Sequence, residues 1–132
     1  MARILVVDDY ADFRLLLRRM LEAEGHNVRE ASDGQAALAL LQQEPFDLVI
    51  TDVLMPQSDG IEVLNALRRS ATGMPVIVTS GGGSTMNAEM ALELGGFLGA
   101  HAMLRKPVRR QELLTAVAAA LATAKPGAAK SD

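Results

Sequence analysis

The chain has 132 residues, a length typical of one domain, and its 49% of apolar residues can form a core, which excludes a disordered chain. Aromatic residues make up only 3%, so we expect an aliphatic core. The net charge of −3 argues against a general nucleic-acid binder, and the absence of cysteine excludes disulfides, thiolate metal sites and cysteine nucleophiles.

The first part of the chain alternates between strand-like runs and helical patterns. Strands are predicted at 3–7, at 27–31 and at 47–51. Between the first two runs, apolar residues recur at helical spacing and predict a helix whose inner face is Phe13, Leu16, Leu17, Met20 and Leu21. A second helix is predicted between the next two runs, with Asp33 available as its cap and Pro45 at its end.

The same alternation continues to the end of the chain. Strands are predicted at 76–79 and 102–104, and a domain over 1–124 is followed by a flexible tail at 125–132. Helices are predicted from three further apolar patterns, which are Ile61, Leu64 and Leu67, then Met86, Met90 and Leu94, then Leu113, Leu114, Val117 and Leu121.

Five successive strand–helix pairs predict an α/β fold, with a parallel sheet covered by helices on both faces. Ligands of such sheets bind outside the carboxyl ends of the strands. The polar residues expected at those ends are Asp8, Asp9, Asp52, Ser80 and Lys106.

Three aspartates at the ends of two strands repel one another if they pack together. A divalent cation resolves this conflict, and carboxylates, carbonyls and water favour Mg²⁺, or Mn²⁺ in its place. The hydroxyl of Ser80 and the ammonium of Lys106 suit a phosphoryl group, and an aspartate beside Mg²⁺ can attack phosphorus. Taken alone, the acidic pair Asp8-Asp9 also fits an ordinary helix cap.

One family shares this ordered set of residues. The motifs are Asp8-Asp9, Asp52 within the segment DVLMPQSDG, Ser80 after the fourth predicted strand, and Lys106-Pro107. They resemble the CheY-like receiver domain of two-component response regulators, over about residues 2–123. The resemblance implies a flavodoxin-like (βα)5 fold with a five-stranded parallel sheet in the order 2-1-3-4-5, and a cis peptide bond before the proline.

The resemblance also implies a role for each residue of the site. Asp52 would accept a phosphoryl group from a sensor histidine kinase or a histidine phosphotransfer protein. Lys106 would pair with a phosphoryl oxygen, and Ser80 would move to donate a hydrogen bond to the phosphate. Four groups would hold Mg²⁺: Asp9 directly, Asp8 mainly through water, Asp52, and the backbone carbonyl of Leu54.

Other residues have competing interpretations. Thr79 is the rival of Ser80 for the hydroxyl that contacts the phosphoryl group, and the family places this hydroxyl at position 80. His26 and His101 are expected in loops or at the surface rather than as phosphoryl donors or metal ligands. Met103 stands three residues before the lysine, where receivers usually carry an aromatic residue that rotates inward on phosphorylation.

The function implied by the resemblance is that of a stand-alone receiver, a phosphoacceptor rather than an enzyme. Phosphorylation would change which downstream protein binds, without direct DNA binding. A phosphorelay intermediate and a fragment of a longer regulator are alternatives. An aspartate-nucleophile Mg²⁺ phosphatase fits less well, because such enzymes use Asp-x-Asp and Asp8-Asp9 are adjacent. No apolar run is long enough to span a membrane, so a cytoplasmic location is expected.

Overall fold

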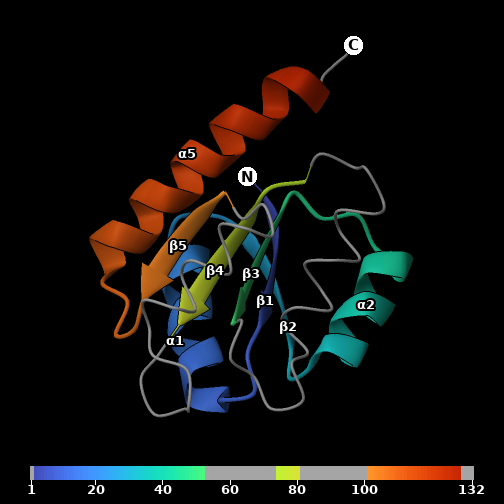
Figure 1. Ribbon diagram of the computed structural model, residues 1–132, viewed down its shortest axis with the longest axis vertical. Coiled ribbons are helices and arrows are strands. Elements are labelled where there is room, and N and C mark those ends of the chain that lie inside the picture. Colours follow the sequence, from blue (N-terminus) through green and yellow to red (C-terminus); the bar gives the residue numbers. More distant parts are fainter. Residues whose placement is uncertain (1, 53–73, 81–100, 129–132) are drawn as a thin grey trace.

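The computed structural model describes residues 2–52, 74–80 and 101–128, with the backbone alone for Ser80 and residues 123–128. Within these ranges, parallel strands form one sheet in the order β2-β1-β3-β4-β5 (Figure 1). The strands are β1 (Arg3–Val7), β2 (Asn27–Ala31), β3 (Leu48–Asp52), β4 (Val76–Ser80) and β5 (Ala102–Arg105). The described helices are α1 (Ala11–Glu22), α2 (Gly34–Gln43) and α5 (Arg110–Ala128). The predicted flavodoxin-like fold and its strand order are confirmed.

Helices cover both faces of the sheet, with α2 on one side and α1 and α5 on the other (Figure 1). Strand β1 lies inside the sheet and sends alternate side chains to the two faces. Leu5 packs in the cluster that contains Ala37 of α2, whereas Val6 packs in the cluster that contains Leu17 of α1 and Leu113 of α5. A strand buried on both faces explains why its sequence is apolar without alternation.

Local sequence signals set the ends of the helices. The carboxylate of Asp33 caps α2 by accepting a hydrogen bond of 2.8 Å from the N–H of Ala36. Helix α2 ends at Gln43, two residues before Pro45, as proline disfavours helical backbone in the residue that precedes it. After α1 the chain turns at Gly25, whose φ of 92° lies in the left-handed region that glycine tolerates.

The predicted inner face of α1 is wrong at one residue. Phe13, Leu17 and Leu21 are buried, but Leu16 is 47% exposed, and Met20 is only partly buried. The buried residues recur every four positions, because a helix packed on a sheet buries a narrow stripe, and Leu16 falls beside that stripe.

Several predicted boundaries also differ from the structure. Strands β3, β4 and β5 each run one residue further than predicted, because the last residue still pairs with the neighbouring strand. Helix α5 runs to Ala128, past the predicted domain limit at residue 124, and the flexibility of the tail at 125–132 stays a prediction. The helices predicted from residues 61–67 and 86–94 lie outside the described residues, and the predicted domain limit itself stays a prediction.

Replacing Leu17 by alanine should lower the free energy of unfolding by about 2–5 kcal/mol, because this fully buried side chain leaves a cavity between α1 and the sheet. Urea unfolding followed by circular dichroism measures the loss. Leu16→Ala is the matched control on the same helix, and its exposed side chain predicts a change within about 0.5 kcal/mol. Equal losses for the two variants would contradict the described packing of α1.

Candidate functional site

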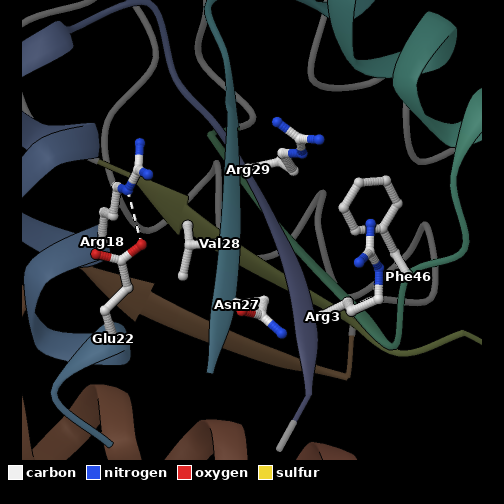
Figure 2. A pocket seen from close by; sticks show the side chains of 7 residues that line it. All are labelled: Arg3, Arg18, Glu22, Asn27, Val28, Arg29 and Phe46. Atoms are coloured by element: carbon white, nitrogen blue, oxygen red, sulfur yellow. Dashed lines mark hydrogen bonds and ion pairs between the residues drawn. The ribbon is translucent and has the colours of Figure 1, made fainter. Parts of the chain in front are cut away.

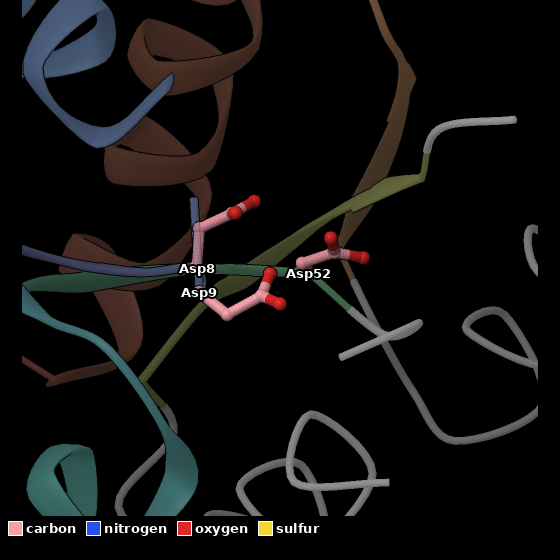
Figure 3. Close-up of side chains that lie close together, drawn as sticks. All are labelled: Asp8, Asp9 and Asp52. Carbon is pink, nitrogen blue, oxygen red and sulfur yellow. The ribbon is translucent and has the colours of Figure 1, made fainter. Parts of the chain in front are cut away.

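The register of the sheet brings the carboxyl ends of β1 and β3 together. Val7 of β1 pairs with Thr51 of β3, so Asp8 and Asp52 follow these positions at the same edge. Figure 3 shows the side chains of Asp8, Asp9 and Asp52 gathered at these strand ends. One carboxylate oxygen of each lies within 4.8 Å of the others, so the predicted acidic cluster is formed.

The aspartates of this cluster differ in exposure. Asp8 is 1% exposed and Asp52 is 5% exposed, whereas Asp9 is an exposed residue. Burying a carboxylate without a partner is costly, so the two inner groups require compensating positive charge or donated hydrogen bonds.

Lys106 supplies the positive charge. It follows β5, and its Nζ lies 2.8 Å from Oδ2 of Asp8 and 3.0 Å from Oδ2 of Asp52. The same ammonium lies 4.3 Å from the centroid of the Phe13 ring on α1. The Lys106–Pro107 peptide bond is cis, as the resemblance implied. One lysine, which follows the outer strand β5, therefore contacts both buried carboxylates.

Asp8 is also held by the start of α1. Its Oδ1 accepts a hydrogen bond of 2.8 Å from the N–H of Tyr10. Its backbone carbonyl accepts one of 2.6 Å from Nη1 of Arg14, and Nε of that arginine donates to Glu30 of β2 at 3.0 Å. These contacts fix both the backbone and the side chain of Asp8, which is a requirement for a precise ligand.

The pKa values of Asp8 and Lys106 depend on burial and on the ion pairs of these residues. Burial raises the pKa of Asp8 above its usual value, although hydrogen bonds from Lys106 and from the Tyr10 N–H act in the opposite direction. Burial also acts to lower the pKa of Lys106, but the hydrogen bonds and charges of Asp8 and Asp52 outweigh it and raise that pKa. The lysine is therefore a permanent cation near neutral pH.

The cluster fits a hard divalent cation. It offers carboxylate oxygens from three residues within a short distance, and these are the ligands that Mg²⁺ prefers. One ammonium does not neutralise three carboxylates, so the site retains negative charge that attracts a cation. Asp8, Asp9 and Asp52 are the groups that would hold it. The predicted fourth ligand, the carbonyl of Leu54, lies outside the described residues.

The strand register also places the predicted hydroxyls. Thr79 pairs with Asp52 and is 1% exposed, which fits the strand position expected for it. Ser80 is the last residue of β4 and pairs with Arg105, so its backbone lies one position beyond Asp52 at the carboxyl edge. The contacts of the Ser80 side chain lie outside what the structure describes, and its role stays a prediction.

Neither histidine belongs to the acidic cluster, and Met103 is an exposed residue. Nδ1 of His26 accepts a hydrogen bond from the N–H of Ala2 at 3.2 Å, and His101 is an exposed residue just before β5. These placements confirm the interpretation of both as loop residues. Met103 is 39% exposed on β5, where Ala102 and Leu104 pack instead against the core cluster of α1 and α5.

Sequence reasoning missed the contacts that α1 makes with the site. Phe13 is predicted as a core residue, and nothing in its spacing indicates that its ring faces Lys106. The bonds from Arg14 to the Asp8 carbonyl and to Glu30 join α1 to the end of β1 and to β2, and no local motif signals them.

Comparison with known proteins agrees with this geometry. The sequence matches the family model of the response regulator receiver domain over residues 4–118. The chain belongs to the response regulator receiver family. It is 41% identical over 121 residues to the transcriptional regulatory protein CpxR of Escherichia coli K12, covering 92% of this chain and 50% of CpxR.

Two further relatives differ in how much of their own length this chain covers. The response regulator MprA of Mycolicibacterium vanbaalenii is 38% identical, covering 94% of this chain and 52% of MprA. A crystal structure of a response regulator receiver domain protein from Clostridium thermocellum has a TM-score of 0.83 at 31% identity, covering 93% of this chain and 96% of that chain. The receiver thus spans about half the length of the curated relatives it matches.

No described helix of this receiver is both long and apolar enough to cross a membrane.

Mg²⁺ should raise the melting temperature of the protein, because a ligand that binds the folded state stabilises it. Asp9→Asn removes one carboxylate of the cluster and should abolish most of this rise. Differential scanning fluorimetry with and without Mg²⁺ measures both effects. Asp12→Asn is the control, since it makes the same charge change at an exposed position in the first turn of α1. A full Mg²⁺ effect in the Asp9 variant would exclude Asp9 as a ligand.

Proposed function

We propose that this receiver accepts a phosphoryl group on Asp52 and signals by a change in protein binding, acting in the cytoplasm. The donor is a phosphohistidine of a sensor histidine kinase or a histidine phosphotransfer protein. A carboxylate oxygen of Asp52 forms the new bond to phosphorus as the bond from phosphorus to the imidazole nitrogen breaks. The imidazole keeps the electron pair of the broken bond and takes up a proton from solvent.

The contacts of Lys106 carry this proposal. Its ammonium lies 3.0 Å from Oδ2 of the acceptor and 2.8 Å from Oδ2 of Asp8, so a phosphoryl group on Asp52 would arrive beside a fixed positive charge. The ammonium would pair with a phosphoryl oxygen and stabilise the charge that develops during transfer. Mg²⁺ held by Asp8, Asp9 and Asp52 would supply further positive charge to the phosphoryl oxygens.

The burial of Asp52 supports its choice as acceptor over Asp9. Asp52 is 5% exposed and in contact with the lysine, whereas Asp9 is exposed and suits a ligand that meets a hydrated ion. Asp8 is buried too, but the contacts from Tyr10 and Arg14 occupy its second oxygen and fix its backbone. Those contacts suit a group that must stay in place rather than one that carries the phosphoryl group.

The output of this receiver is proposed to be protein binding without direct DNA contact. The chain carries a net charge of −3, which opposes association with the phosphate backbone. The relatives CpxR and MprA are about twice as long as the region they share with this chain, and CpxR is named a transcriptional regulatory protein. DNA recognition by those proteins is therefore no guide to the receiver region itself.

A phosphorelay intermediate is the second candidate, since it needs the same acceptor, lysine and metal site. Reversible transfer to a histidine phosphotransfer protein would distinguish it. An enzyme that turns over phosphate esters is disfavoured, because the aspartates at the end of β1 are adjacent and the proposed acceptor comes from β3. We propose a protein that promotes only its own phosphorylation and dephosphorylation.

Incubation with acetyl phosphate and Mg²⁺ should add one phosphoryl group to the protein, and Asp52→Asn should abolish it. Intact-mass spectrometry measures the added mass, and cleavage by hydroxylamine identifies an acyl phosphate. Asp12→Asn is the control for charge and should label like the parent protein. Labelling of the Asp52 variant at the parental level would refute the assignment, and rapid turnover of acetyl phosphate would favour a phosphatase.

Beryllofluoride, which mimics the phosphoryl group on aspartate, should change the set of proteins captured by the immobilised chain. The treated and untreated parent are compared by quantitative mass spectrometry, with Asp52→Asn treated in the same way as the control. A partner that discriminates between the two parent samples and not between the two Asp52 samples supports the proposed switch. Identical captures would reject signalling by changed protein binding.

A further inference from the structure

We infer that Phe13 is a positioning residue for Lys106, and that its ring face holds the lysine ammonium beside Asp52 during phosphorylation. This inference rests on the proposed function, and it assigns to a core residue of α1 a part in the chemistry at the end of β5. The residue does not touch the phosphoryl group and acts through the lysine alone.

The geometry of the contact is that of a cation–π interaction. Nζ of Lys106 lies 4.3 Å from the centroid of the Phe13 ring, well inside the distance of about 6 Å at which such contacts are significant. Phe13 is 9% exposed, so its ring is largely shielded from water, which strengthens the attraction. The lysine side chain is 20% exposed and retains a route to solvent.

The ring differs from the other groups that contact the ammonium. Among the described contacts of Nζ, those with Asp8 and Asp52 are to charged oxygens, while the contact with Phe13 is to a neutral surface. A cation in the acidic cluster attracts the same carboxylates, and transfer converts Asp52 from an anion into an acyl phosphate. The ring is unchanged by both events, so it can hold the ammonium in place while its charged partners change.

Lysine needs such a support because its four-carbon side chain is flexible. If Phe13 did not hold it, the ammonium could leave for water whenever Mg²⁺ weakened its ion pairs, and fewer molecules would be ready for transfer. Weaker attraction by the ring should therefore slow the phosphorylation of Asp52.

The chain contains a matched control for this contact. The ring of Phe46 lies 5.7 Å from the guanidinium carbon of Arg3 and is 8% exposed, so it too is a buried phenylalanine that faces a cation. It packs in the core cluster on the α2 side of the sheet, whereas Phe13 packs in the cluster on the opposite side. Phe46 and Arg3 both line a surface hollow of about 300 Å³ beside β2, away from the acidic cluster (Figure 2).

The test replaces Phe13 by phenylalanines that carry one, two and three ring fluorines, inserted at this position alone. Fluorine withdraws electron density from the ring face and weakens cation–π attraction while the shape of the side chain is nearly kept. The rate constant for phosphorylation by acetyl phosphate at saturating Mg²⁺ should fall stepwise with fluorine number, by between about twofold and thirtyfold in total. The same series at Phe46 should leave the rate constant unchanged.

A second comparison separates attraction from packing. In a Lys106→Met background the ammonium is gone, so the residual rate constant should no longer depend on fluorine at position 13. A rate constant that does not change with fluorine number at Phe13 in the parent background would overturn the inference. An equal fall of the rate constant in the Phe46 series would also overturn it, as would a fall in the Phe13 series that persists in the Lys106→Met background. Melting temperatures of all variants are recorded, and a rate that follows the melting temperature rather than the fluorine number would also overturn it.

The two proposals fail in different ways in this experiment. If unmodified protein gains no phosphoryl group, or if Asp52→Asn gains one at the parental level, the proposed function fails. If the parent is labelled at Asp52 and only the Phe13 series is flat, the proposed function stands and the positioning role of Phe13 is rejected.

Discussion

The organisation of the site depends on one lysine that forms ion pairs with two buried carboxylates. Asp8 and Asp52 lie at the ends of adjacent strands, and neither can be buried as an anion without a cation beside it. The ion pairs of Lys106 meet this need, but desolvating three charged groups cancels much of the Coulombic gain. Well-packed apolar residues would stabilise the same edge of the sheet at least as well. The charges are therefore better explained by the chemistry they permit than by the stability they add.

The same contacts explain why Lys106 can exchange one ion-pair partner for another. The ammonium and a divalent cation are attracted to the same oxygens, so a cation that binds must share Asp8 and Asp52 with Lys106. A phosphoryl group then offers the ammonium new oxygen acceptors close to the old ones. The lysine would then exchange a contact with a carboxylate for one with the phosphoryl group.

The sequence was sufficient to predict the sheet and most of the acidic site, for a physical reason. Strands buried on both faces must be apolar throughout, so the runs that became β1, β3 and β4 are visible in the sequence. Polar residues that directly follow parallel strands lie at the carboxyl edge of the sheet. The sequence therefore predicted that Asp8, Asp9, Asp52 and Lys106 lie close together. The strand order came from the resemblance to receivers, since periodicity carries no information about which strands are neighbours.

What the sequence did not reveal depends on tertiary contacts. The exposure of Leu16 follows from the angle at which α1 meets the sheet, and helical spacing alone gave it the same status as Leu17. Helix α5 runs to Ala128 through Pro126 and Gly127, two residues of low helix propensity, so local sequence signals placed the end of this helix earlier. The contact between the Phe13 ring and Lys106 joins residues far apart in the chain, and the spacing of an apolar residue on a helix predicts only that it is part of the core.

Helix α1 connects this chemistry to the rest of the domain. The N–H of its N-cap residue Tyr10, the ring of Phe13 and the guanidinium of Arg14 each contact Asp8 or Lys106. Phe13 belongs to the same core cluster as Val108, two residues after Lys106, and as Leu113 of α5. A shift of the lysine toward a phosphoryl group would therefore change the packing between α1 and α5. The contacts that fix the resting site are also the ones through which a change in its charge would reach these two helices.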